Sequence, residues 1–120
     1  MIELNEKTQQ DFLNREWVQR LLDAGVDMSD AKYEILKTVD TSQEYINYCG
    51  KYDPDCGKYI NGIEVTDKLP TYTVSELLYK LRNRYGIYTI FNCYRNLDVD
   101  NIPIIESFAS ILLQQYNETI

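Results

Sequence analysis

The sequence predicts an α+β fold: one small domain over residues 1–120, with about three helices packed on a small antiparallel or mixed sheet of three to four strands. Two observations carry this prediction. Hydrophobic residues recur at helical spacing in some segments and alternate, as they do in strands, in others. The 120 residues, 44% hydrophobic and 26% charged, also have the size and composition of one globular domain, and no linker or repeat divides them.

A first helix is expected over residues 8–24. Thr8 followed by Asp11 resembles a capping pair, although Asn5 could begin the helix one turn earlier, and Gly25 is the kind of residue that ends a helix. The apolar residues of this segment fall within one arc of a helical wheel, which predicts that they face the core. They are Leu13, Trp17, Val18, Leu21 and Ala24.

The next segment, AKYEILKTV at residues 31–39, changes to the alternation of a half-buried strand. Ile35 is expected on its buried face and Glu34 on its polar face. Leu36 and Lys37 interrupt the alternation, which indicates a bulge or a break in register at this point.

The segment PTYTVSELLYKL contains the clearest helix start in the chain. Thr73 precedes Glu76 by three residues, the spacing of a capping box, and Tyr72 and Leu77 have the spacing of a hydrophobic staple. These signals predict a second helix and say nothing about chemistry.

After Gly86, which ends this helix, residues 86–94 (GIYTIFNCY) are predicted to form a strand. Both of its faces would be largely apolar, so it is expected to be central and covered on both sides. The last helix is expected over residues 103–116, capped by Asp100 or Asn101 and buried along one stripe. That stripe consists of Ile105, Phe108, Ala109, Leu112 and Tyr116.

The charges of the chain argue against several classes of function. Twelve basic and nineteen acidic residues give a net charge of −7, which disfavours binding to a phosphate backbone. The absence of histidine removes the commonest general base and metal ligand, so neither an enzyme nor a cofactor is expected. The first sixty residues carry a net charge of −5, and one basic cluster stands out in the second half. It consists of Lys80, Arg82, Arg84 and Arg95.

The N-terminus lacks the basic start and apolar stretch of a secretory signal, and no apolar run is long enough to cross a bilayer. A cytoplasmic location is therefore expected, with the three cysteines as reduced thiols.

The segment CGKYDPDCGKY at residues 49–59 repeats the letters CGKY and allows four interpretations. A zinc site would need more ligands than Cys49 and Cys56, such as Cys93 or a nearby aspartate. A disulfide between Cys49 and Cys56 would need an irregular loop, because the two sulfur atoms cannot meet in a regular hairpin. A turn fits well, since Pro54 presets one central residue and a glycine follows.

The fourth interpretation, a recognition tip, builds on the turn. It would join tyrosines, which are favoured at interfaces, to two aspartates in an acidic contact surface for a partner protein. This candidate binding site consists of Tyr48, Tyr52, Asp53, Asp55 and Tyr59. A compositional bias toward tyrosine would produce the same letters without function.

A second candidate site would bind an anionic ligand such as a nucleotide. Lys80 and Arg84 lie one helical turn apart at the end of the second helix, and Tyr88 could stack on a base. Cations at a helix C-terminus also complement the helix dipole, which is the simpler explanation.

The segments NREWVQRLLDAGVDMSDAKYEI and LPTYTVSELLYKL resemble a group of short uncharacterised proteins from gut bacteria and their phages. The resemblance covers the first forty residues and the second helix, and it implies a small accessory protein of phage or mobile-element origin without implying any catalytic residue. Together with the acidic first half and the tyrosines, it leads us to expect a non-enzymatic protein that binds another protein, with binding of a small anion as the alternative. The sequence leaves open whether the protein forms a homo-oligomer.

Overall fold

The computed structural model describes residues 2–4, 8, 11–40, 43–55, 57–60, 62–95 and 103–119, apart from the side chains of residues 2, 93, 94 and 117–119. An antiparallel sheet and four helices make up the described part, which confirms the predicted α+β class. The helices are α1 (Arg15–Asp23), α2 (Val74–Tyr85), α3 (Ile87–Arg95) and α4 (Ile104–Thr119). The strands are β1 (Ile2–Glu3), β2 (Tyr33–Thr38), β3 (Glu44–Tyr48), β4 (Tyr59–Ile60) and β5 (Ile63–Thr71).

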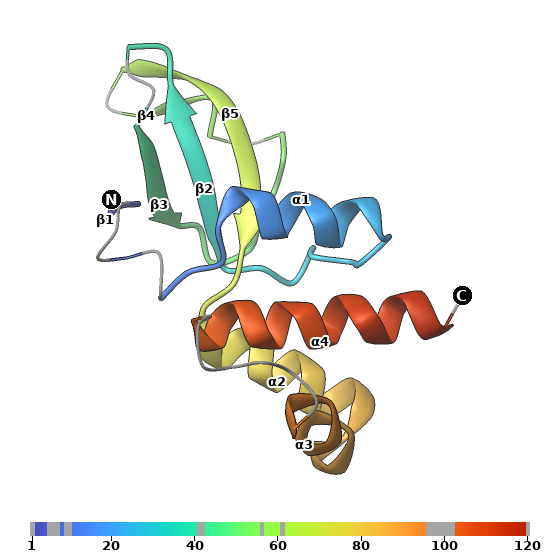
Figure 1. Cartoon of the computed structure of the whole chain (residues 1–120). Helices are drawn as coiled ribbons and strands as arrows, with labels where there is room; N and C mark the ends of the chain where they lie inside the picture. Colours follow the sequence, from blue (N-terminus) through green and yellow to red (C-terminus); the bar gives the residue numbers. More distant parts are fainter. Residues whose placement is uncertain are drawn as a thin grey trace.

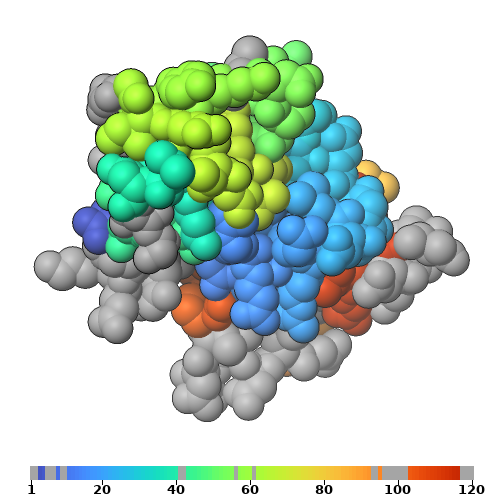
Figure 2. Space-filling view, turned by 90° about the horizontal axis from the view of Figure 1, so that it is seen from above, coloured from blue at the N-terminus to red at the C-terminus, as the bar shows by residue number. Residues whose placement is uncertain are grey.

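The sheet has the order β1-β3-β2-β5-β4, so β2 is its central strand. Helix α1 lies against the sheet, and α4 packs beneath α1 (Figure 1). Helix α2 begins three residues after β5 and packs along α4, and α3 lies lowest, farthest from the strands. The molecule is therefore elongated, with extents of 47 × 28 × 21 Å. Seen from above the sheet, the residues of α1 and of the strands form one continuous surface (Figure 2).

Helix α1 begins at Arg15, so the expected start at Thr8 is wrong. Leu13 lies before the helix, and its backbone N–H donates to the carbonyl of Tyr72 at 3.0 Å. Asn14 then caps the helix by accepting the backbone N–H of Trp17 at 3.0 Å. The predicted inward stripe is confirmed in part. Val18 and Leu21 of the helix and Leu13 before it are fully buried, whereas Trp17 and Ala24 are partly buried.

The predicted break in β2 is confirmed, since the register with β5 shifts between Lys37 and Thr38. The predicted exposure of Glu34 is wrong. Glu34 is 3% exposed and Ile35 and Leu36 are fully buried, so β2 is covered on both faces.

The capping box of α2 is confirmed. The Thr73 backbone N–H donates to Glu76 Oε1 at 2.9 Å, and the Glu76 N–H donates to Thr73 Oγ1 at 3.2 Å. Tyr72 and Leu77, the expected staple, are both buried in the core. Gly86 ends the helix with a φ of +80°.

The predicted strand over residues 86–94 is wrong, because residues 87–95 form α3. Its isoleucines, tyrosine and threonine favour strands only where a pleated surface is there to pack against, and α3 packs on α2 and α4 instead. The expectation of two covered faces fails too, since Ile90 is buried but Tyr88 is 83% exposed.

The last helix is confirmed. Of its predicted stripe, Ile105, Phe108, Ala109 and Leu112 are buried and Tyr116 is partly buried. The expected caps Asp100 and Asn101 lie outside the described residues.

Candidate functional site

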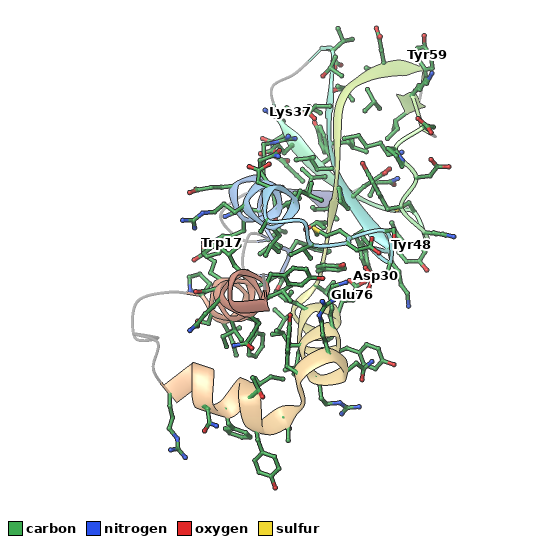
Figure 3. The ribbon with its side chains drawn as sticks, turned by 90° about the vertical axis from the view of Figure 1, so that its right-hand side faces the viewer. Trp17, Asp30, Lys37, Tyr48, Tyr59 and Glu76 are labelled. Carbon is green, nitrogen blue, oxygen red and sulfur yellow. The ribbon has the colours of Figure 1, made fainter. Side chains whose placement is uncertain are left out.

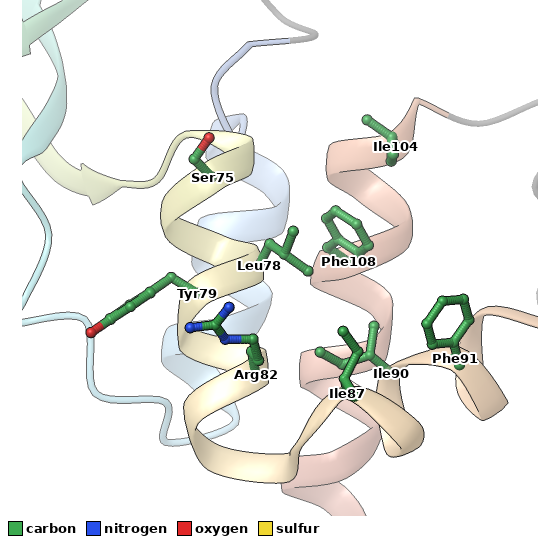
Figure 4. Close-up of a pocket in the computed structure, with 9 residues that line it drawn as sticks. All are labelled: Ser75, Leu78, Tyr79, Arg82, Ile87, Ile90, Phe91, Ile104 and Phe108. Carbon is green, nitrogen blue, oxygen red and sulfur yellow. The ribbon is translucent and has the colours of Figure 1, made fainter.

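A groove of about 580 Å³ lies between α2, α3 and α4 (Figure 4). Apolar side chains form most of its walls: Leu78 projects from α2 toward Phe108 on α4, with Ile90 of α3 below them. Nine residues line the groove, and Arg82 is the one among them that carries a formal charge at neutral pH. The nine are Ser75, Leu78, Tyr79, Arg82, Ile87, Ile90, Phe91, Ile104 and Phe108.

Local sequence signals place each wall of the groove. The capping box at Thr73 fixes where α2 begins, so that Ser75, Leu78 and Arg82 fall on one face at helical spacing. Gly86 then turns the chain directly into α3, where Ile87 and Phe91 are one turn apart. The groove is therefore formed by an abrupt change of helix direction at a glycine.

The walls of the groove are unusually exposed for such apolar side chains. Phe91 is 61% exposed, Ile87 51%, Ile104 49% and Leu78 38%, whereas Phe108 on the floor is 7% exposed. Scattered exposed hydrophobic residues are ordinary, but these gather around one cavity. Such clustering is typical of a surface that another molecule covers.

The basic cluster is divided between different surroundings. Lys80 Nζ lies 3.2 Å from Asp30 Oδ2 and donates to the Asp27 carbonyl at 2.8 Å, so Asp30 compensates its charge. Arg84 Nη1 donates to the Tyr116 hydroxyl at 2.8 Å, and its guanidinium lies 4.5 Å from the centre of that ring.

The predicted anion site of Lys80, Arg84 and Tyr88 is thus not assembled around one point. Lys80 points toward the turn after α1, and Arg84 toward α4. Tyr88 is 83% exposed on α3. Binding of a nucleotide by these residues stays a prediction.

The predicted recognition tip is also spread out. Tyr48 pairs with Tyr33, which in turn pairs with Thr71, whereas Tyr59 pairs with Glu64. The seven residue steps from Glu64 to Thr71 separate these positions by about 23 Å along the sheet. Figure 3 accordingly shows Tyr59 at one end of the sheet and Tyr48 near the helices.

Both tyrosines at the two ends are about two-thirds exposed. Tyr52 is half-buried, and its hydroxyl donates to the Lys68 carbonyl at 3.4 Å. The exposed Asp53 carboxylate accepts the backbone N–H of Asp55 at 2.9 Å, which is the turn that the sequence predicts. The five residues of the predicted recognition tip therefore do not form one continuous contact surface, because Tyr48 and Tyr59 lie at opposite ends of the sheet.

The described residues between β3 and β4, 49–55 and 57–58, lie over one face of the sheet, where they border a pocket with Glu34 and Lys68. The two repeated glycines, Gly50 and Gly57, share a φ of +72°, a conformation that disfavours other residues. The loop is attached at Lys58, whose carbonyl accepts the Val65 N–H at 2.8 Å. Cys56 and the side chain of Cys93 lie outside the described residues, so the zinc and disulfide interpretations stay open.

A polar pocket of about 570 Å³ lies between this loop and the sheet, with the buried Glu34 at its base. Asn47 Nδ2 donates to Glu34 Oε1 at 3.0 Å, and Lys68 Nζ lies 3.2 Å from Glu34 Oε2. Lys68 Nζ also donates to the Asp53 carbonyl at 2.6 Å, which ties the loop to the ion pair.

The electrostatics of this pocket do not prepare a nucleophile. Burial raises the pKa of the Cys49 thiol, and the Glu34 carboxylate raises it further. Burial likewise raises the pKa of Tyr52, again with a contribution from Glu34. Both groups therefore stay protonated at neutral pH, and a reactive thiol needs the opposite shift.

The sequence does not indicate the groove, because the composition of residues 86–94 predicts a strand. Ile87, Phe91 and Arg95 are spaced four residues apart, which places them on one face of a helix and equally on one face of a strand, so this spacing does not choose between the two. Glu34 was missed because its partner Lys68 is 34 residues away and the strand pattern predicts an outward side chain.

Among the described residues, no helix has the length and apolar character needed to cross a membrane. No protein-family model matches the chain, and the searches of curated proteins and of solved structures found no match either.

Proposed function

We propose that this chain is a non-enzymatic accessory protein that acts in the cytoplasm by binding another protein, through the groove between α2, α3 and α4. The occupant that fits is a helical segment of the partner. The resemblance noted in the sequence adds the proposal that the protein belongs to a phage or mobile element.

The clustered exposure of Leu78, Ile87, Phe91 and Ile104 carries this proposal. Burial of apolar surface contributes roughly 25 cal/mol per Å². A partner that covers these half-exposed aliphatic and aromatic side chains would therefore gain binding free energy from each of them. Binding of the apolar face of a partner helix in an apolar groove is a recurring mode of protein recognition.

The pocket beneath the doubled loop favours this function less. Its charged groups already contact each other, since Lys68 lies within ion-pair distance of Glu34 and donates to the Asp53 carbonyl. Its role is better explained as holding the loop against the sheet.

An affinity capture from host lysate, with quantitative mass spectrometry, tests the proposal. Leu78→Lys places a charge in the groove, and Tyr59→Lys places the same charge on an exposed residue at the far end of the sheet. We expect a protein that is captured by the wild type and by Tyr59→Lys but lost with Leu78→Lys. Circular dichroism establishes that both variants stay folded.

Capture that survives Leu78→Lys but disappears with Tyr59→Lys would overturn the groove as the binding surface and return the contact to the tyrosines of the sheet. Repeating the capture in high salt distinguishes a third possible binding surface, the acidic part of the chain. Residues 1–73 carry fourteen acidic and eight basic side chains, so a partner lost only in high salt from both variants would be bound by that acidic part.

A further inference from the structure

We infer that the segment bound in this groove is an acidic amphipathic helix: apolar on the face that enters the groove, with glutamates or aspartates flanking that face. This inference rests on the proposed function and specifies the partner's chemistry.

Helices α2 and α3 form two of the three walls of the groove. Residues 74–95 carry four basic side chains and one acidic one, a net charge of +3 in a chain of −7. Asp98 and Asp100, which follow α3, lie outside the described residues. The single acid of residues 74–95, Glu76, is engaged in the capping box. On α4, Glu106 accepts from Trp17 Nε1 at 3.2 Å and so is directed toward α1.

The four cations of this segment differ in what they contact. Lys80 is paired with Asp30. Arg84 Nη1 donates to the Tyr116 hydroxyl, a neutral partner that directs the guanidinium toward α4 without compensating its charge. Within the described part of the chain, Arg82 and Arg95 take part in no ion pair, and both are exposed. An acidic partner would supply the opposite charges that these two guanidinium groups lack.

Both arginines follow an apolar wall residue at helical spacing. Arg82 follows Leu78 by four residues on α2, and Arg95 follows Phe91 by four residues on α3, so each arginine lies one turn beyond an apolar wall residue on the same face. A bound helix whose apolar side chains contact Leu78 and Phe91 would bring its flanking residues to the arginines.

The same charges argue against a second copy of the chain as the occupant. A symmetric dimer joins the same patch on both subunits. It would bring Arg82 and Arg95 of one copy toward those of the other, and like charges placed together across an interface oppose association.

A display library of 16-residue amphipathic helices tests the inference. Three apolar positions at helical spacing and four flanking positions are randomised, and the library is selected on the full wild-type chain with Leu78→Lys as the counter-selection. We expect the enriched peptides to carry mostly Glu and Asp at the flanks. For the best of them, replacing the flanking acids by glutamine should weaken binding in a calorimeter.

The arginines are tested by the double variant Arg82→Gln, Arg95→Gln. Exposed charge pairs contribute little each, so affinity for an acidic peptide should fall by roughly threefold to tenfold, and the loss should shrink in high salt. Lys51→Gln, Lys58→Gln is the matched control, because it removes two exposed positive charges from the loop on the sheet. It should leave affinity nearly unchanged.

The outcomes separate the two proposals. Enriched peptides with neutral or basic flanks would overturn the acidic partner while leaving the groove as the binding surface. A library from which no peptide depends on Leu78 would overturn the groove itself. A concentration-dependent dimer in light scattering that Leu78→Lys dissociates would overturn the inference in favour of a second copy.

Discussion

Glu34 Oε2 and Lys68 Nζ lie 3.2 Å apart beneath the loop that contains the doubled CGKY, with the two side chains 3% and 12% exposed. Oε2 makes this ion-pair contact but no hydrogen bond within the described residues. The pair joins the central strand β2 to β5, and Lys68 extends the connection to the loop through the Asp53 carbonyl.

Breaking this pair from one side should be costly. Lys68→Met leaves a buried carboxylate without its cation, and we expect the free energy of unfolding to fall by about 3 to 5 kcal/mol in urea denaturation. Replacing both partners, as Glu34→Leu with Lys68→Met, should recover most of that loss. A double variant as unstable as Lys68→Met would show that the carboxylate was not the cause.

Alkaline pH should destabilise the protein through Tyr72. Burial raises the pKa of this tyrosine far above its ordinary value, and its hydrogen bond to Asp30 raises it further. The folded chain therefore keeps a proton that the unfolded chain loses above about pH 10. The stability present below pH 10 should fall by roughly 1.4 kcal/mol per pH unit above it.

Urea denaturation between pH 9 and pH 11 measures this slope. Tyr72→Phe should reduce it by about one proton's worth, whereas Tyr88→Phe, on a side chain that is 83% exposed, should leave it unchanged. Equal slopes in the wild type and Tyr72→Phe would mean that other groups control alkaline stability. Tyr52, Tyr85 and Cys49 are the candidates, because burial raises the pKa of each.

The two phenylalanines of the groove should separate binding from stability. Phe108→Ala removes a side chain that is 7% exposed and should cost about 3 to 5 kcal/mol. Phe91→Ala removes one that is 61% exposed and should change stability by no more than about 0.5 kcal/mol while weakening partner binding. A large stability loss in Phe91→Ala, measured by thermal denaturation, would show that this ring belongs to the core.

The capping box of α2 predicts a smaller and local effect. Thr73→Ala removes the hydroxyl that accepts the Glu76 N–H and should lower the free energy of unfolding by about 1 kcal/mol. Ser75→Ala, two residues later on an exposed position of the same helix, is the control and should change it little. Equal effects of the two substitutions in chemical denaturation would mean that the cap does not stabilise the helix.

The sequence alone determined the elements whose signals are local. The capping box at Thr73 and Glu76, the turn at Asp53 and the interrupted pattern near Lys37 each depend on groups a few residues apart, so their letters predict them directly. The buried stripes of α1 and α4 were predictable for the same reason, since helical periodicity is visible within one segment.

Only the tertiary structure decided which state the segment after Gly86 takes and what surrounds Glu34. Ile, Tyr and Thr residues suit a strand if a sheet accepts them, but here α2 and α4 provide the neighbouring surface and the segment becomes α3. Likewise, Glu34 is buried because Lys68 and the loop converge on it from distant parts of the chain. The groove and the polar pocket both arise from contacts of this long-range kind, which local pattern does not encode.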